Sequence, residues 1–89
     1  MPLDSPSSAG YALVMDWDQE LDARGLLCPL PVLKARKRLG AMETGDVLRM
    51  MADDPAAIID VPHYCSESGN QLLEASDGAE GQVYLIRRT

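Results

Sequence analysis

The sequence predicts an α/β two-layer sandwich with the element order β-α-β-α-β-β, in which two helices cover one face of a four-stranded mixed sheet. Strand-like segments alternate with segments of helical periodicity, and this arrangement implies parallel strands joined by a right-handed crossover. The last two strand-like segments are separated only by turn-forming residues, which predicts an antiparallel hairpin. A chain of 89 residues, 46% hydrophobic and 25% charged, fits one small domain.

The first expected element is an edge strand over residues 17–23, where apolar and acidic residues alternate. Residues 1–15 are rich in Pro, Ser and Gly without sustained periodicity, so we expect a flexible N-terminal tail before a folded domain over residues 16–89. Arg24 and Gly25 then form a turn that leads the chain to Cys28.

A first helix is predicted over residues 29–39, with Gly40 as its C-terminal stop. Helical spacing places an apolar face toward the sheet and a basic face on the opposite side. The apolar face holds Val32, Ala35 and Leu39, and the basic face holds Lys34, Lys37 and Arg38. The nearly continuous apolar run over residues 47–52 predicts a central strand.

A second helix is expected after Asp53-Asp54-Pro55, a typical N-terminal capping sequence. Pro62 predicts a break in this helix, whose second part should end at Gly69. Its core-facing stripe is predicted to be Ile58, Val61 and Cys65. The final hairpin is expected to pair residues 71–75 with residues 82–88.

Cys28 is the candidate reactive residue of the chain, because it directly precedes Pro29-Leu30-Pro31 at a helix start. With Pro29 at the first helical position and Pro31 at the third, Cys28 is the expected N-cap, and only the amide of Leu30 remains to face its sulfur. The positive end of the helix dipole would then make this thiol more acidic than a free cysteine. The alternative is that Cys28 is a small buried hydrophobe.

The charge pattern favours a protein partner over a nucleic acid or a membrane. The formal charge is −6, with 14 acidic and 8 basic residues, which opposes direct nucleic-acid binding. No apolar run approaches the roughly 20 residues that span a bilayer, and no secretory signal is evident, so we expect a cytoplasmic protein. The basic face formed by Lys34, Lys37 and Arg38 is either an ordinary solvated surface or a docking surface for an acidic partner.

The second cysteine, Cys65, has the spacing of a core residue and is expected to be structural. Cys28 and Cys65 do not form a Cys-x-x-Cys pair, which favours free thiols over a disulfide. The single histidine, His63, lacks companions at zinc-ligand spacing, so neither a metal nor a cofactor is expected.

Four segments together resemble the TusA family, also called SirA-like, over about residues 21–88. They are Leu21-Asp22-Ala23-Arg24-Gly25 leading into Cys28-Pro29-Leu30-Pro31, Ala52-Asp53-Asp54-Pro55-Ala56, Asp60-Val61-Pro62 before Tyr64-Cys65, and Tyr84-Leu85-Ile86-Arg87. The sequence departs from the family pattern at Asn70, where a histidine is common, and at Leu30, where some members have an acidic residue.

The resemblance implies the same sandwich and a cysteine, here Cys28, that carries sulfur as a persulfide. It implies a sulfurtransferase acting mainly as a carrier, with a cysteine desulfurase or rhodanese-like protein as donor and a relay protein as acceptor. The implied pathways are tRNA thiolation, molybdenum-cofactor synthesis and sulfur oxidation. Pro29, Leu30, Pro31 and Arg24 would support the thiol, and the basic face would orient partners. The competing hypothesis is a noncatalytic regulatory or interaction domain of the same fold.

Overall fold

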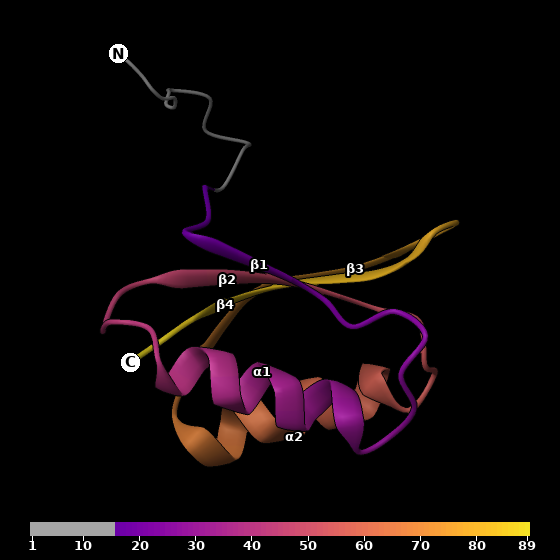
Figure 1. Cartoon of the computed structure of the whole chain (residues 1–89), viewed down its shortest axis with the longest axis horizontal. Helices are drawn as coiled ribbons and strands as arrows, with labels where there is room; N and C mark the ends of the chain where they lie inside the picture. The colour runs from indigo at the N-terminus through magenta and orange to yellow at the C-terminus, as the bar shows by residue number, and fades with distance from the viewer. Residues whose placement is uncertain (1–15) are drawn as a thin grey trace.

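The computed structural model describes residues 16–89, and the predicted tail over residues 1–15 lies outside the described residues. The described residues form four strands and two helices in the predicted order. These are β1 (Gln19–Asp22), α1 (Leu30–Gly40), β2 (Val47–Ala52), α2 (Ala57–Ser68), β3 (Gln71–Gly78) and β4 (Gly81–Arg87). Both helices lie on the same side of the sheet, so the predicted two-layer α/β sandwich is confirmed (Figure 1).

The sheet is mixed, and its strand order is β1-β2-β4-β3. Strand β1 pairs in parallel with β2, as the predicted crossover through α1 requires, and it forms one edge of the sheet. Strands β3 and β4 form the predicted antiparallel hairpin, and β4 also pairs antiparallel with β2. The carboxyl end of β1, from which the chain runs to Cys28, therefore lies beside the carboxyl end of β2, from which it runs to α2.

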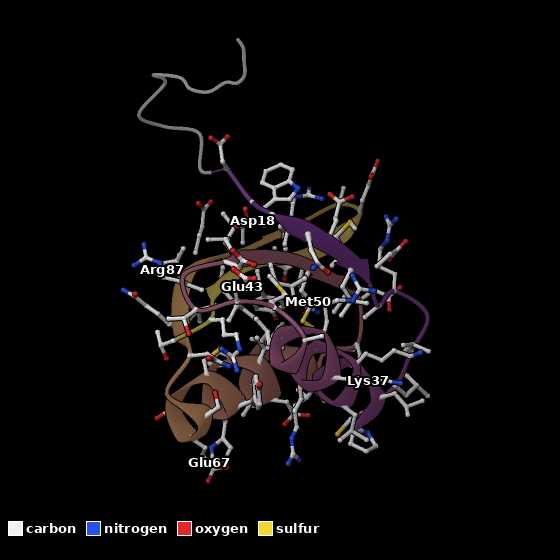
Figure 2. All side chains as sticks on the ribbon, turned by 60° about the vertical axis from the view of Figure 1, so that its left-hand side comes forward. Asp18, Lys37, Glu43, Met50, Glu67 and Arg87 are labelled. Carbon is white, nitrogen blue, oxygen red and sulfur yellow. The ribbon has the colours of Figure 1, made fainter. Side chains whose placement is uncertain are left out.

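The core lies between the sheet and the helices. Strand β2 alternates half-buried and buried residues, and its buried side chains are those of Leu48, Met50 and Ala52. Met50 points from the sheet toward the helix layer (Figure 2). Helix α1 covers this surface with Pro31, Ala35 and Leu39, while Val32, the third residue of the predicted apolar face, is only partly buried.

Helix α2 differs from the prediction in two respects. It runs unbroken from Ala57 to Ser68 with Pro62 inside it, so the predicted break is wrong. Pro62 removes one N–H from the helix, and the burial of Val61 and Cys65 on either side of it offsets that loss. The core-facing stripe begins at Ala57, whereas Ile58 is 48% exposed.

Glycines end α2 and start β4 as their backbone conformations require. Gly69 has φ +84°, and its amide donates to the carbonyl of Cys65 at 3.0 Å, which confirms the predicted C-terminal stop. Gly81 has φ +116°, and a Cβ there would lie 2.8 Å from the carbonyl oxygen of Ala52. None of the helices formed by the described residues is long and apolar enough to cross a membrane.

Candidate functional site: an exposed thiol between two helices

Cys28 lies in the loop between β1 and α1, and its side chain is exposed. The peptide bond between Cys28 and Pro29 is cis. The loop turns first at residues 23–26, where the amide of Leu26 donates to the carbonyl of Ala23 at 3.3 Å. It turns again at residues 27–30, a segment that contains Cys28 itself.

The start of α1 differs from the prediction by one residue. Pro29, and not Cys28, is the N-cap, and Pro31 occupies the second helical position. The amide of Leu30 therefore closes the second turn by donating to the carbonyl of Leu27 at 2.8 Å. The prediction that this amide faces the Cys28 sulfur is wrong, because the amide is already used by the backbone.

Two aspartates at the end of β2 hold this loop in place. The amide of Gly25 donates to Oδ1 of Asp53 at 2.9 Å, and the amide of Cys28 donates to Oδ2 of Asp54 at 2.6 Å. The other carboxylate oxygen of Asp54 accepts the amide of Ala56 at 3.1 Å, at the entrance to α2. The predicted capping of α2 by these aspartates is wrong, because Ala56 is the N-cap and no side chain caps the helix. Asp54 acts in the turn before the helix, and its link to the Cys28 loop was not predicted.

Asp54 is itself fixed by a buried polar pair on β4. Nε2 of Gln82 donates to the backbone carbonyl of Asp54 at 3.0 Å, and the hydroxyl of Tyr84 donates to Oε1 of Gln82 at 2.6 Å. Gln82 is 5% exposed and Tyr84 is 3% exposed. Buried polar groups that are hydrogen-bonded hold their neighbours in one arrangement. These contacts therefore fix the position of Cys28 relative to the sheet, through Asp54 and Gln82.

The thiol opens on a groove of about 580 Å³ between α1 and α2. Apolar and charged side chains from both helices line it: Cys28, Pro29, Val32, Leu33, Arg36, Asp60, His63, Tyr64, Glu67 and Ser68. Figure 2 shows Glu67 on the side of α2 that faces away from the sheet. The sequence analysis assigned no role to Arg36 or Asp60. Arg36 follows Val32 by four residues, and this helical spacing was the signal that could have placed it beside the thiol.

The electrostatics of the groove oppose ionisation of Cys28. Hydrogen bonding to the Asp60 carboxylate is the largest cause that raises the pKa of the Cys28 thiol, and desolvation and the charges of Asp60 and Asp54 raise this pKa further. The predicted lowering of the thiol pKa is therefore wrong. Its physical reason is that two carboxylates face the cysteine, while the amide expected to stabilise the anion bonds elsewhere.

Arg24 does not supply the positive field expected of it. Its Nε lies 2.9 Å from Oδ1 of Asp22, and its Nη2 donates to the other oxygen of the same carboxylate at 3.0 Å. This hydrogen-bonded pair lowers the pKa of Asp22 to about 2. The charge of the Arg24 guanidinium is thus neutralised by Asp22, and Arg24 does not line the thiol groove.

The predicted basic face opens on a different groove, of about 480 Å³, beside α1 and β1. Lys34, Lys37 and Arg38 line it together with Leu21, Leu30, Leu33 and Ala41. Lys37 projects outward from α1 (Figure 2). Arg38 differs from the two lysines because its guanidinium donates to the carbonyl of Glu20 at 3.0 Å. Leu33 lines both grooves, so the basic face adjoins the thiol groove without containing Cys28.

The remaining candidates lie on α2. Cys65 is 4% exposed and unpaired, as expected for a structural residue, and burial raises the pKa of its thiol to about 11. His63 lies at the groove, with Nε2 3.3 Å from Oε2 of Glu67, and both side chains are exposed. Within residues 16–89, no group of three or more His, Cys, Asp or Glu side chains is arranged to hold a metal ion.

The fold and the site define a class of small α/β sandwiches that present one exposed thiol at the N-terminus of the first helix. Comparisons with known proteins agree with this class. Residues 19–88 match the family described as sulfurtransferase TusA. The chain is 43% identical over 74 residues to the sulfur carrier protein TusA of Allochromatium vinosum, which covers 83% of this chain and 97% of that protein.

Among solved structures, the SirA-like protein of Desulfitobacterium hafniense superposes with a TM-score of 0.66 at 25% identity. The match covers 79% of this chain and 95% of that one. The chain belongs to the TusA family.

Proposed function

We propose that this protein is a sulfur carrier in which Cys28 holds sulfane sulfur as a persulfide. The contrast between the two free cysteines carries the proposal: Cys28 is exposed in a groove, whereas Cys65 is 4% exposed in the core. Sulfur transfer between proteins needs a thiol that a second sulfur atom can approach in line with the bond to be broken. Membership of the TusA family supports the same role.

The chemistry consists of two exchanges. In loading, the Cys28 sulfur attacks the sulfane sulfur of a donor persulfide, a new S–S bond forms, and the donor sulfur leaves as a thiolate. In unloading, an acceptor thiolate attacks the terminal sulfur of the Cys28 persulfide, and Cys28 leaves as a thiolate. The sulfane sulfur keeps its oxidation level in both exchanges, so no external oxidant is consumed.

A sulfur carrier requires a donor and an acceptor protein, and the surface around Cys28 is suited to receive them. Of the six large hydrophobic side chains that are exposed within residues 16–89, five belong to the loop before α1 or to the first turns of the two helices: Leu27, Leu30, Leu33, Ile58 and Ile59. Exposed apolar clusters of this kind are typical of protein-binding surfaces. The basic groove beside them, formed by Lys34 and Lys37, would attract an acidic partner.

For the partners we propose a cysteine desulfurase or a rhodanese-like protein as donor and a relay protein with an acceptor thiol. The pathways proposed are tRNA thiolation, molybdenum-cofactor synthesis or sulfur oxidation. We also propose the cytoplasm as the compartment, because a carrier thiol has to stay reduced between cycles.

The test is intact-protein mass spectrometry after incubation with glutathione persulfide. We expect the wild type to gain one sulfur atom, which a reductant removes, and Cys28→Ser to gain none. Cys65→Ser is the matched control and should still gain the sulfur. If the sulfur maps to Cys65, or if Cys28→Ser gains it, the proposed carrier residue is wrong. A wild-type protein that gains no sulfur but still binds partners after Cys28 substitution would support the noncatalytic interaction domain instead.

A further inference from the structure

Asp60 is the ionisable group with the largest effect on the pKa of the Cys28 thiol. It lies in the first turn of α2, is half-buried, and lines the same groove as Cys28. Its carboxylate is the first cause of the raised pKa of the Cys28 thiol. None of the ion pairs formed within residues 16–89 includes Asp60. Its carboxylate is therefore not neutralised by a neighbouring cation.

The relative position of the two groups is fixed by the backbone. Asp54 binds the amide of Cys28 with one carboxylate oxygen and the amide of Ala56 with the other, so the thiol loop and the start of α2 share one anchor. Asp60 follows on the first turn of that helix, and its amide donates to the carbonyl of Ala56 at 2.9 Å. The carboxylate thus reaches the thiol from an element whose start is tied to the thiol loop.

Loading creates a need for a proton acceptor at this position. The raised pKa of Cys28 means that the resting carrier holds a neutral thiol at neutral pH, whereas the attacking species in thiol exchange is the thiolate. The amide of Leu30, which could have stabilised a free thiolate, is bonded to the carbonyl of Leu27. The thiol proton consequently has to leave as the sulfur attacks.

We propose that Asp60 accepts the proton of the Cys28 thiol while the Cys28 sulfur attacks the donor persulfide. This role rests on the proposed carrier function of Cys28. As the Sγ–H bond breaks, its proton passes to an Asp60 oxygen and Sγ bonds to the sulfane sulfur. The S–S bond of the donor breaks, and its electron pair leaves with the donor thiolate. The single negative charge that begins on Asp60 ends on the donor sulfur, which recovers the proton from Asp60 or from water.

Other charged groups also face the thiol groove and bear on its pH dependence. They are Arg36 from α1 and His63 and Glu67 from α2. Asp54, in the loop before α2, does not line the groove, but its charge also raises the pKa of the thiol. Arg36 lines the groove but is not among the groups that shift the pKa of Cys28, and Glu67 is paired with His63. Asp54 already binds two backbone amides. Asp60 alone among these groups lines the groove, forms no ion pair within residues 16–89 and acts on the pKa of the thiol.

The test combines two readouts on Asp60→Asn. The first is the pH profile of Cys28 alkylation by iodoacetamide, which follows the thiolate fraction. The second is the rate at which glutathione persulfide loads the protein at pH 7, followed by intact mass. Glu74→Gln is the control for net charge, because it removes one carboxylate from the exposed surface of β3, away from the groove. Circular dichroism establishes that each variant is folded.

We expect Asp60→Asn to move the alkylation profile to lower pH, since a negative charge beside the thiol is lost, and yet to load at least about tenfold more slowly. Asp60→Glu should recover part of the rate, and Glu74→Gln should match the wild type in both readouts. Loading that accelerates with the thiolate fraction, or that stays unchanged, would overturn the proton-acceptor role. The carrier proposal fails separately, if the wild type does not load or if Cys28→Ser does.

Discussion

The backbone amide of Cys28 donates a hydrogen bond of 2.6 Å to Oδ2 of Asp54, 26 residues further along the chain. The second oxygen of the same carboxylate accepts the amide of Ala56 at 3.1 Å. One side chain therefore serves two elements, the loop that presents the thiol and the turn that starts α2. Hydrogen bonds to a charged acceptor are among the stronger ones in proteins, so this contact stabilises the fold as well as the site.

Asp54→Asn is expected to destabilise the protein by about 1–3 kcal/mol. Both oxygens of Asp54 are acceptors, so an asparagine would turn its NH2 group toward one of the two amides and leave that amide unsatisfied. Asp53→Asn is the matched control: Asp53 accepts one hydrogen bond, from Gly25, which an asparagine oxygen can keep. Urea unfolding of both variants measures the difference. Equal free energies of unfolding would show that Asp54 does not act as a double acceptor.

Cys28 should react with iodoacetamide at higher pH in the folded protein than in an unfolded peptide of the same local sequence. The Asp60 and Asp54 carboxylates raise the pKa of this thiol in the fold, so at any given pH the folded protein contains less thiolate. The measurement compares the alkylation rates of the folded protein and the peptide between pH 6 and pH 10. A folded-protein profile displaced to lower pH would mean that the helix dipole outweighs the two carboxylates.

The fold was predictable because its signals are local and repeat along the chain. The nearly continuous apolar run over residues 47–52 predicted β2 with the bounds that the structure shows, and Gly69 correctly predicted the end of α2. The break at Pro62 was predicted wrongly, because burial of neighbouring residues can offset the stability that a proline costs inside a helix. Here Val61 and Cys65 are almost fully buried. Packing of this kind is set by the rest of the fold and leaves no trace in local periodicity.

The position of Cys28 before a helix was predictable, but its environment was not. The effect of Pro29 and Pro31 on the helix start was read correctly to within one residue. The charge at the thiol comes instead from Asp54 and Asp60, which are 26 and 32 positions away in the sequence and reach Cys28 through the packing of α2 beside α1. Rules for helix ends describe the helix itself and not the carboxylates that a second helix brings to it.

Charge reversal on the basic face should separate docking from folding. Lys34→Glu and Lys37→Glu should slow sulfur transfer from a cysteine desulfurase at low salt, with less effect as salt increases, and change stability by less than about 0.5 kcal/mol. Arg38→Glu should also weaken the attachment of β1, because Arg38 donates to the carbonyl of Glu20. Its expected cost is about 1 kcal/mol. Transfer rates that do not change at low salt would identify the basic face as an ordinary solvated surface.

The buried thiol of Cys65 should make the protein less stable in alkaline solution. Burial raises the pKa of this thiol from 9.0 to about 11, so folding favours the protonated form. Above pH 9 the unfolded chain ionises first and binds fewer protons than the folded one, and the free energy of unfolding then falls as pH rises. The contribution is complete below pH 9 and is lost by about pH 11. Its size is about 2–3 kcal/mol.

Cys65→Ala provides the comparison that isolates this contribution. The pKa of Cys28 and that of Tyr84 are also raised, in the latter case chiefly by burial, so the wild type and the variant share those slopes. Urea unfolding between pH 8 and pH 11 should show a steeper loss of stability for the wild type than for Cys65→Ala. The variant is expected to be less stable at pH 8, since it loses buried sulfur, and the gap should narrow as pH rises. Parallel pH dependences would mean that Cys65 ionises as readily in the fold as in the unfolded chain, which its burial against Val61 and the sheet argues against.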